Sequence, residues 1–327
     1  MNFQEAKTVV QEFYTRIDIA DPGSIAAGMN LHCAFHYLWR GVHPFNTLHG
    51  ARGVAETFWE PLHQSFTKLQ RREQIFLAGE NAFKQDGSIW VVSMGHLLGL
   101  FDEPFLGFEP TRKVVFLRYA EFHRVEERMI HETALYLDIL DFLSQIGANP
   151  LATQTGTAVL TPSPRTQDGL LRDPQSSQAG IQTLAVMNAM LDDLTSNMRS
   201  PKEELLRNWE DDMTWFGPGG IGTTYIIDRY REQHSTPFED TLEFVRHNGH
   251  QVRMAEGHYS GFFGYPSLTL RMKGDFMGLP ACNAEADMRI VDIYRRKEDK
   301  LAENWIFIDM PHFLKMQGID ILGQARA

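Results

Sequence analysis

The chain contains two copies of one sequence unit, and this internal repeat constrains the fold more than any other feature. Residues 107–151 and 278–322 align without a gap at a shift of 171 residues, with ten identical positions. The identical pairs are Gly107/Gly278, Arg118/Arg289, Arg124/Arg295, Glu127/Glu298, Glu132/Glu303, Asp138/Asp309, Phe142/Phe313, Leu143/Leu314, Gly147/Gly318 and Leu151/Leu322. Other pairs are similar in kind, such as Glu121 with Asp292. A repeated unit of roughly 140–150 residues is the size of a domain, so the sequence predicts two related domains.

The boundary between the two copies is set by a segment of different composition. Residues 151–178 are rich in Ser, Thr, Gln and Pro and show no sustained apolar period, so we expect a linker between domains at 1–150 and 179–327. A surface loop within one larger domain is the alternative. Upstream of the main repeat, GHLLGLF (95–101) matches GHYSGFF (257–263) at a shift of 162, which implies an insertion in the second copy.

Each copy begins with helical patterns and ends with strand patterns. Apolar residues recur at helical spacing in the first part of each copy, and Val-, Ile-, Phe- and Tyr-rich runs divided by turn residues follow. The expected helices are 2–16, 50–69, 180–194, 202–209 and 224–233, and the expected strands of the first copy are 88–101, 113–125 and 128–140. Helices followed by a run of strands indicate an α+β fold with antiparallel sheets.

Charge and composition exclude several classes of partner. The formal net charge is −11 and there is no basic run, so we expect neither a nucleic-acid partner nor a membrane partner. No apolar run approaches the ~20 residues that span a bilayer, and the N-terminus lacks the pattern of a secretory signal. The two cysteines, Cys33 and Cys282, form no disulfide framework. A reducing, cytoplasmic location is the expectation.

The repeat retains acidic residues at two positions of its last strand. Strand alternation places Glu132 and Asp138 on one face with Tyr136, and it groups Glu303, Trp305 and Asp309 in the same way. A carboxyl group on an apolar face would have a raised pKa, which suits proton transfer near neutral pH. A structural role is open for both positions. The glutamates could pair with Arg118 and Arg289 on the adjacent strand, and the aspartates could cap the helix that follows.

Histidines supply further candidates. His123 lies on the strand before Asp138 and could meet it across the sheet, where Tyr294 is the second copy's counterpart, although either side chain could simply flank the hairpin. His96 and His258 each follow a glycine, and a core or edge position is the alternative for both. His32 and His36 have the spacing of one helix face, but no carboxylate or second histidine pair accompanies them. We therefore expect no metal site.

Motifs for covalent catalysis and for cofactors are missing from the sequence. There is no G-x-S-x-G nucleophile elbow, no P-loop and no G-x-G-x-x-G. FGPGGIG (216–222) lacks the lysine and the strand–helix context of a phosphate loop. We expect no cofactor.

The second part of each copy resembles a known family. The first copy has PTRK (110–113), HRV (123–125) and IHETALYLD (130–138), and the second has GHYSGFFG (257–264), YRR (294–296) and LAENWIFID (301–309). These strings resemble the SnoaL-like polyketide cyclases of the nuclear transport factor 2-like superfamily, which also holds ketosteroid isomerases. The resemblance covers about 50 residues of each half. It implies a cone-shaped α+β domain, in which helices pack on the concave face of a curved sheet around an apolar pocket.

The resemblance also implies a reaction. Members of the family are implied to close a ring by an intramolecular aldol step without a cofactor, using an aspartate that matches Asp138 and a histidine that matches His123. The catalytic candidates are therefore Asp138, His123 and the second-copy Asp309. We favour the first copy because only it has the histidine. The substrate-binding candidates are Tyr14, His36, Trp39, His96, Glu132, Tyr136, Trp215, His258, Glu303 and Trp305.

Three functions remain open at this point. The leading prediction is a cofactor-independent cyclase, isomerase or lyase that acts on a small carbonyl or polyketide-like compound. The second is a non-catalytic binding protein for a small apolar ligand, and the third is a purely structural pair of domains. The expected partner is a small-molecule substrate or ligand. We also expect the two halves of the chain to pair as an internal pseudo-dimer, and a further homodimer stays open. We expect the two cones to pair through the outer faces of their sheets, with Thr133, Leu135 and Leu137 on the outer face.

Overall fold

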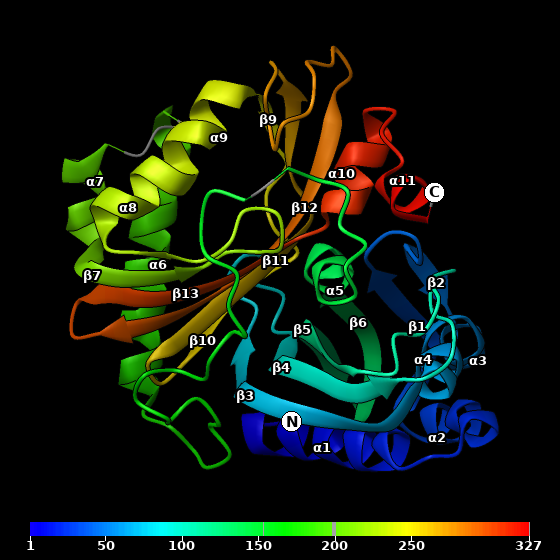
Figure 1. Ribbon diagram of the computed structural model, residues 1–327. Coiled ribbons are helices and arrows are strands. Elements are labelled where there is room, and N and C mark those ends of the chain that lie inside the picture. Colours follow the sequence, from blue (N-terminus) through cyan, green and yellow to red (C-terminus); the bar gives the residue numbers. More distant parts are fainter. Residues whose placement is uncertain (153, 198–200, 327) are drawn as a thin grey trace.

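The computed structural model describes residues 1–152, 154–197 and 201–326, and it has two curved sheets with helices packed against each (Figure 1). Its first half comprises α1 (Phe3–Asp18), α2 (Ile25–His32), β1 (Cys33–Gly41), β2 (Thr47–His49), α3 (Ala51–Val54), a π-helical turn (Ala55–Trp59), α4 (Glu60–Ser65), β3 (Phe66–Glu80), β4 (Ile89–Phe101), β5 (Val114–Glu126), β6 (Met129–Leu137) and α5 (Ile139–Gln145). The strand order is β2-β1-β6-β5-β4-β3, and only the β1–β6 pair is parallel within this sheet of the described chain.

The second half repeats this plan. Its elements are α6 (Ser177–Asn197), α7 (Lys202–Asn208), β7 (Trp209–Phe216), β8 (Thr224–Tyr225), α8 (Ile227–Tyr230), a π-helical turn (Arg231–Ser235), α9 (Thr236–Thr241), β9 (Leu242–His247), β10 (Val252–Glu256), β11 (Tyr259–Met272), β12 (Ala286–Lys297), β13 (Lys300–Ile308), α10 (Met310–Met316) and α11 (Ile321–Arg326). The strand order is β10-β11-β12-β13-β7-β8, β9 also pairs with β11, and β7 runs parallel to β13. The predicted α+β class with two sheet domains is confirmed.

Local sequence signals account for the helix that opens the chain. The side chain of Asn2 accepts a hydrogen bond from the Glu5 backbone N–H, and the Glu5 carboxylate accepts one from the Asn2 N–H, so a capping box starts α1. The apolar stripe of α1, including Val10 and Phe13, is buried against the first sheet. The predicted helix at 50–69 ends earlier, because β3 begins at Phe66. Strands β1 and β3 are not predicted from the sequence.

The hairpins at the ends of the two repeats lie where the sequence places them. Glu127 and Arg128 both adopt positive φ, of 49° and 61°, in the turn between β5 and β6. That geometry gives a two-residue turn whose twist matches the flanking strands.

The upstream part of the repeat is aligned differently in the structure. Gly95 lies in the middle of β4 opposite Tyr119, whereas Gly257 and His258 lie in the turn between β10 and β11. The residue opposite Ile290, which is the counterpart of Tyr119, is Gly264. The match of GHLLGLF with GHYSGFF is therefore wrong as a structural alignment, and Gly264 is the true counterpart of Gly95.

The outer faces of the two sheets cover each other. Phe263 of β11 lies 5.2 Å from Phe122 of β5 and 5.5 Å from Trp90 of β4 between ring centroids. Tyr136 of β6 donates a hydrogen bond to the Gly264 carbonyl at 2.9 Å. The face of β6 that contacts the other half is not the expected one. Ala134 and Tyr136 face the other half, whereas Thr133, Leu135 and Leu137 face their own helices. Strand alternation fixes which residues share a face but not which face is concave.

Backbone and ion-pair contacts also join the halves along one edge. The Ala82 N–H donates to the Arg253 carbonyl at 2.8 Å. The Lys7 ammonium is buried, pairs with the Glu256 carboxylate at 2.7 Å and also bonds to the Leu171 carbonyl. This contact links α1 to β10 through the segment between the halves.

The connecting segment has no helix or strand among its described residues before α6 begins at Ser177. Its residues 157–160 are exposed, as expected for a linker. Thr161 and Leu171 are buried instead, and the backbone of Gly169 and Leu171 exchanges hydrogen bonds with Phe76 of β3. This part of the segment is therefore packed against the first half and does not lie free on the surface.

Within the described residues, no helix combines the length and the apolar character needed to cross a membrane.

Candidate functional site

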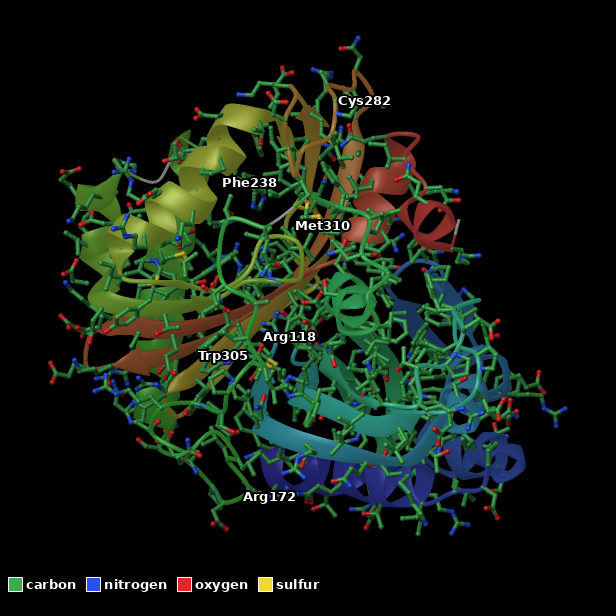
Figure 2. The ribbon with its side chains drawn as sticks, viewed as in Figure 1. Arg118, Arg172, Phe238, Cys282, Trp305 and Met310 are labelled. Carbon is green, nitrogen blue, oxygen red and sulfur yellow. The ribbon has the colours of Figure 1, made fainter. Side chains whose placement is uncertain are left out.

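A cavity of about 160 Å³ lies between the second sheet and the helices that cover it. Alternate residues of β12 and β13 form its floor, and residues of α6, α7, α9 and the π-helical turn at 231–235 form its walls. Six aromatic side chains line it, namely Trp209, Trp215, Tyr230, Phe238, Phe262 and Tyr294. Phe238 is labelled in Figure 2, on the helix that lies over this sheet. A cavity of about 150 Å³ accommodates a molecule the size of benzene.

Asp292 of β12 is a buried carboxyl group in the floor of this cavity. Burial raises its pKa from the ordinary 3.8 to about 7, and hydrogen bonds from Asn304 and Tyr294 only partly offset that effect. The Asn304 amide donates to Oδ1 at 2.9 Å from the neighbouring strand β13. This carboxyl group can therefore both accept and release a proton near neutral pH.

Two tyrosines and two histidines of the cavity each keep one protonation state near pH 7. Burial raises the pKa of the Tyr230 and Tyr294 hydroxyls above the ordinary value of 10, so both remain hydrogen-bond donors. Burial lowers the pKa of His234 and His250 to about 3, so both imidazoles are neutral. His234 stacks on Trp215 at 4.0 Å and His250 on Phe262 at 3.9 Å between centroids.

Two serine hydroxyls of the cavity, those of Ser235 and Ser267, have no hydrogen-bond partner within the described part of the chain. Ser235 ends the π-helical turn, and Ser267 lies at the irregular stretch of β11 between Gly264 and Leu268. Both side chains are buried and both line the cavity. The Ser267 hydroxyl occupies the space that a Cβ at position 264 would need, so the glycine there allows its placement.

The equivalent space in the first half is occupied by a charged network. Glu121 is the counterpart of Asp292, and its carboxylate accepts hydrogen bonds from Tyr14 at 2.9 Å and from Arg71 at 3.1 Å. Arg71 also pairs with Asp18 and lies 3.7 Å from the centre of the Tyr14 ring. His123 bonds to the Tyr14 hydroxyl at 2.8 Å. All these groups except Asp18 are buried.

The charges of this network determine the state of Glu121. Burial alone would raise the pKa of its carboxyl group, but His123, Arg71 and the Tyr14 hydroxyl more than offset that effect and lower the pKa below its ordinary value. Glu121 is therefore an ionised structural partner at neutral pH, in contrast to Asp292 at the same position of the repeat.

Asp138 and Asp309 lie on the outer faces of their sheets, where they cap helices and join the halves. Asp138 accepts from the Asp141 N–H in its own half and, at 2.9 Å, from the Gly219 N–H of the other half. Asp309 likewise accepts from the His312 N–H and from the His43 N–H. The capping role that was the alternative for these residues is the one the structure has.

Arg118 completes this contact between the halves. Its guanidinium pairs with Asp138 at 3.3 Å and donates to the carbonyls of Phe216 and Gly217 at 2.8 and 3.1 Å. Figure 2 places Arg118 at the centre of the molecule, where the halves meet. Arg289 pairs with Asp309 at 3.0 Å in the second copy.

The expected contact between His123 and Asp138 is wrong. In the β5–β6 register His123 is opposite Thr133, to which it bonds at 2.8 Å, and Leu137 is opposite Tyr119. Asp138 is thus five residues beyond Thr133, which corresponds to about 17 Å at 3.4 Å per residue. It also lies on the face of the sheet opposite to that of His123.

The repeated glutamates do not pair with Arg118 and Arg289. Glu132 pairs with Arg40 of β1 at 2.7 Å, and Glu303 pairs with Arg295 and accepts the Arg165 N–H. Both lie on the outer faces of their sheets, away from the cavity.

The remaining binding candidates divide between the two faces. Trp39 and Trp215 occupy equivalent inner positions, opposite Thr133 and Asn304, but only Trp215 lines the cavity. Tyr136 and Trp305 belong to the outer faces, as does His96, which is opposite Arg118. His36 and His258 are exposed.

Metal binding has no support in the part of the chain that the structure describes. His32 ends α2 and His36 lies in β1, so the two do not share a helix face. No group of three or more His, Cys, Asp or Glu side chains among the described residues is arranged to hold a metal ion.

The sequence interpretation missed Asp292, Asn304, Tyr230, His234, Ser235 and Ser267 as cavity residues. One signal was present: Glu121 and Asp292 are both acidic and lie at the same position of the repeat. The serines carry no comparable signal, because only the tertiary structure places them at the cavity.

Comparison with known proteins gives matches to solved structures. No family model and no curated protein matches the chain. It is similar to a nuclear transport factor 2-like protein from Burkholderia xenovorans (TM-score 0.35, 15% identity, 42% of this chain and 97% of that one). It is also similar to a candidate SnoaL-like polyketide cyclase from Jannaschia sp. (TM-score 0.36, 19% identity, 45% and 94%) and to a candidate polyketide cyclase from Xanthomonas campestris (TM-score 0.35, 16% identity, 45% and 99%).

Proposed function

We propose that this chain is a cofactor-independent acid/base enzyme that moves a proton on a small carbonyl compound bound in the second-half cavity. The observation that carries the proposal is the carboxyl group of Asp292, which faces an aromatic cavity and has a pKa of about 7. A general base is most effective when its pKa lies near the working pH. The proposed site is thus in the second half rather than at His123 and Asp138.

The proposed step uses Asp292 as the base. Its carboxylate takes a proton from the carbon next to the substrate carbonyl, and the electron pair of that C–H bond moves to the carbonyl oxygen as an enolate forms. Tyr230 donates a hydrogen bond to this oxygen, since burial keeps its hydroxyl protonated, whereas the hydroxyl of Tyr294 donates to Asp292. Charge that develops on the oxygen is stabilised most where water is excluded.

The fate of the enolate decides the reaction class. If Asp292 returns the proton to another carbon, the reaction is an isomerisation. If the enolate carbon attacks a second carbonyl of the same molecule, the reaction is an aldol closure, as expected of a cyclase. The reverse cleavage would be a lyase reaction. The first two reactions share the proton abstraction, and the cleavage runs the closure in reverse: the base takes the hydroxyl proton, the C–C bond breaks, and Asp292 returns a proton to the same enolate. All three are consistent with the proposal.

Hydrogen–deuterium exchange at the carbon next to a carbonyl tests the first step without knowledge of the natural substrate. Cyclohexanone, a one-ring ketone, is incubated with the full chain in D₂O, and loss of its α-proton NMR signal is followed. We expect catalysed exchange that increases as the pD rises through about 7, because the base must be ionised. Asp292→Asn should lower the rate by about 10²- to 10⁴-fold.

Glu121→Gln is the matched control, because it changes the same position of the repeat in the first half. A correctly folded Glu121→Gln variant should exchange at the rate of the unmodified chain. Exchange that depends on Glu121 and not on Asp292 would refute the assignment of the second half, and exchange unaffected by both changes would refute the mechanism.

A non-catalytic binding protein for a small apolar ligand is the second candidate. The observation that favours it is the cavity wall, in which aromatic side chains predominate. Saturable binding of one-ring compounds without any exchange by the folded chain would favour this alternative.

A further inference from the structure

Ser235 and Ser267 place two unpartnered hydroxyl groups in the same cavity as Asp292. Ser235 is 5% exposed and Ser267 is 2% exposed, and neither hydroxyl has a hydrogen-bond partner among the residues that the structure describes. A buried hydroxyl without a partner destabilises the fold, so such groups are normally met by water or by a ligand. Because both line the cavity, a bound molecule can reach both.

The charges around the cavity disfavour an anion. Its described lining residues include the carboxylates Asp193, Glu204, Glu239 and Asp292 and no Lys or Arg. Arg207, which lies outside the cavity lining, pairs with both Asp193 and Glu204 at the surface. These two carboxylates therefore offset its positive charge at the cavity. His234 and His250 are neutral, as described above. A ligand carboxylate or phosphate would therefore find no cationic partner among these residues.

The cavity volume limits the size of the ligand. About 160 Å³ accommodates one six-membered ring with small substituents. Stacked pairs such as Trp215 with His234 give flat walls on which a planar ring can lie.

We propose that the cavity binds an uncharged one-ring compound that carries two oxygen substituents, one hydrogen-bonded to Ser235 and the other to Ser267. The inference rests on the proposed function only for the choice of cavity, and it names the substrate class of that site. Ser235 and Ser267 are then specificity-determining residues, because a ligand without the oxygens offers neither hydroxyl a hydrogen-bond partner.

The three dihydroxybenzenes test the inference, since catechol, resorcinol and hydroquinone share one composition and differ only in the spacing of their oxygens. Their affinities for the full chain are measured by calorimetric titration beside phenol, which has one oxygen, and benzoate, which is an anion of similar size. We expect at least one isomer to bind about tenfold or more tightly than phenol, and benzoate to bind more weakly than phenol. Isomers that bind no more tightly than phenol, or benzoate that binds best, would overturn the inference.

Serine substitutions identify the groups responsible. Ser235→Ala and Ser267→Ala should each weaken binding of the best isomer about 2- to 10-fold, as expected for loss of one hydrogen bond. Ser260→Ala is the matched control, because its hydroxyl is also buried and unpartnered but does not line the cavity. It should leave the affinity unchanged. Equal effects of all three variants, or no effect of any, would refute the assignment.

Binding is measured in the Asp292→Asn variant as well, so that this inference and the proposed function can fail separately. Serine-dependent binding of a dihydroxybenzene without catalysed exchange would refute the acid/base function and keep the recognition. Exchange that depends on Asp292, without any preference for a ligand with a second oxygen, would refute the recognition and keep the acid/base function.

Discussion

Replacing Asp292 with asparagine should stabilise the protein at alkaline pH while it removes activity. In the unfolded chain this carboxyl group titrates near its ordinary pKa of 3.8, whereas in the folded chain burial raises the pKa to about 7. Between these values the folded state holds a proton that the unfolded state has released. Stability therefore falls as the pH rises from about 4 to about 7, and it changes no further above that range.

The size of the effect follows from the pKa difference. Each pH unit in this window corresponds to about 1.4 kcal/mol, so the wild-type chain loses about 3 kcal/mol between pH 5 and pH 8 through this group. Asparagine has no charge to bury, and it retains a side-chain oxygen that can accept from Asn304. The unfolding free energy of Asp292→Asn, relative to that of the wild type, should therefore rise by about 3 kcal/mol between pH 5 and pH 8.

Urea unfolding of both proteins at pH 5, 6, 7 and 8, followed by tryptophan fluorescence, measures the difference directly. Glu121→Gln is the control of opposite sign: its carboxylate is stabilised by Arg71 and Tyr14, so the substitution should lower stability throughout this range. A difference between Asp292→Asn and the wild type that stays constant from pH 5 to pH 8 would refute the account of Asp292 as a buried group that ionises near pH 7.

Three further predictions concern the contacts between the halves. Arg118→Met should lower the unfolding free energy by about 3–5 kcal/mol, measured by urea unfolding, because it leaves the buried Asp138 carboxylate without its cation. Lys7→Met should destabilise the chain more at pH 8 than at pH 5 in the same assay, because burial raises the pKa of its partner Glu256, which therefore takes up a proton more readily as the pH falls. Limited proteolysis should cut first within 151–178, at the exposed residues 157–160, and should leave two fragments that stay associated on gel filtration; a first cut inside the sheets would contradict the proposed domain boundaries.

The sequence predicted the repeated architecture because identical residues recur at structurally demanding positions. Asp138 and Asp309 begin equivalent helices, and Glu127 and Glu298 lie in equivalent hairpin turns at positive φ. Such local requirements are visible in a sequence without any tertiary information.

The candidate site was predicted less well, for a physical reason. Alternation correctly grouped Asp138 with Tyr136, but both faces of β6 are apolar because one packs on helices and the other on the second sheet. Hydrophobic pattern cannot separate two buried faces. The acidic residue repeated at Asp138 and Asp309 therefore serves a contact between the halves. The cavity carboxyl group of Asp292 lies on the opposite face of its sheet, which alternation alone does not identify as the concave one.

The charged network around Arg71 was also beyond prediction. Arg71 lies on β3 and reaches Glu121 on β5 and Asp18 at the end of α1, so the three residues come together only in the folded chain. The sequence gives no sign that the Arg71 guanidinium fills the interior of the first half, whereas the equivalent space in the second half remains a cavity.

Covalent linkage of the two units has a consequence for symmetry. In a homodimer of one such unit, any substitution would appear twice, so a side chain that fills one cavity would fill both. Here Arg71 occupies the interior of one copy while the other keeps an open cavity with a protonatable floor. A tandem chain can thus fill the interior of one unit and leave the interior of the other open, which two identical subunits cannot do.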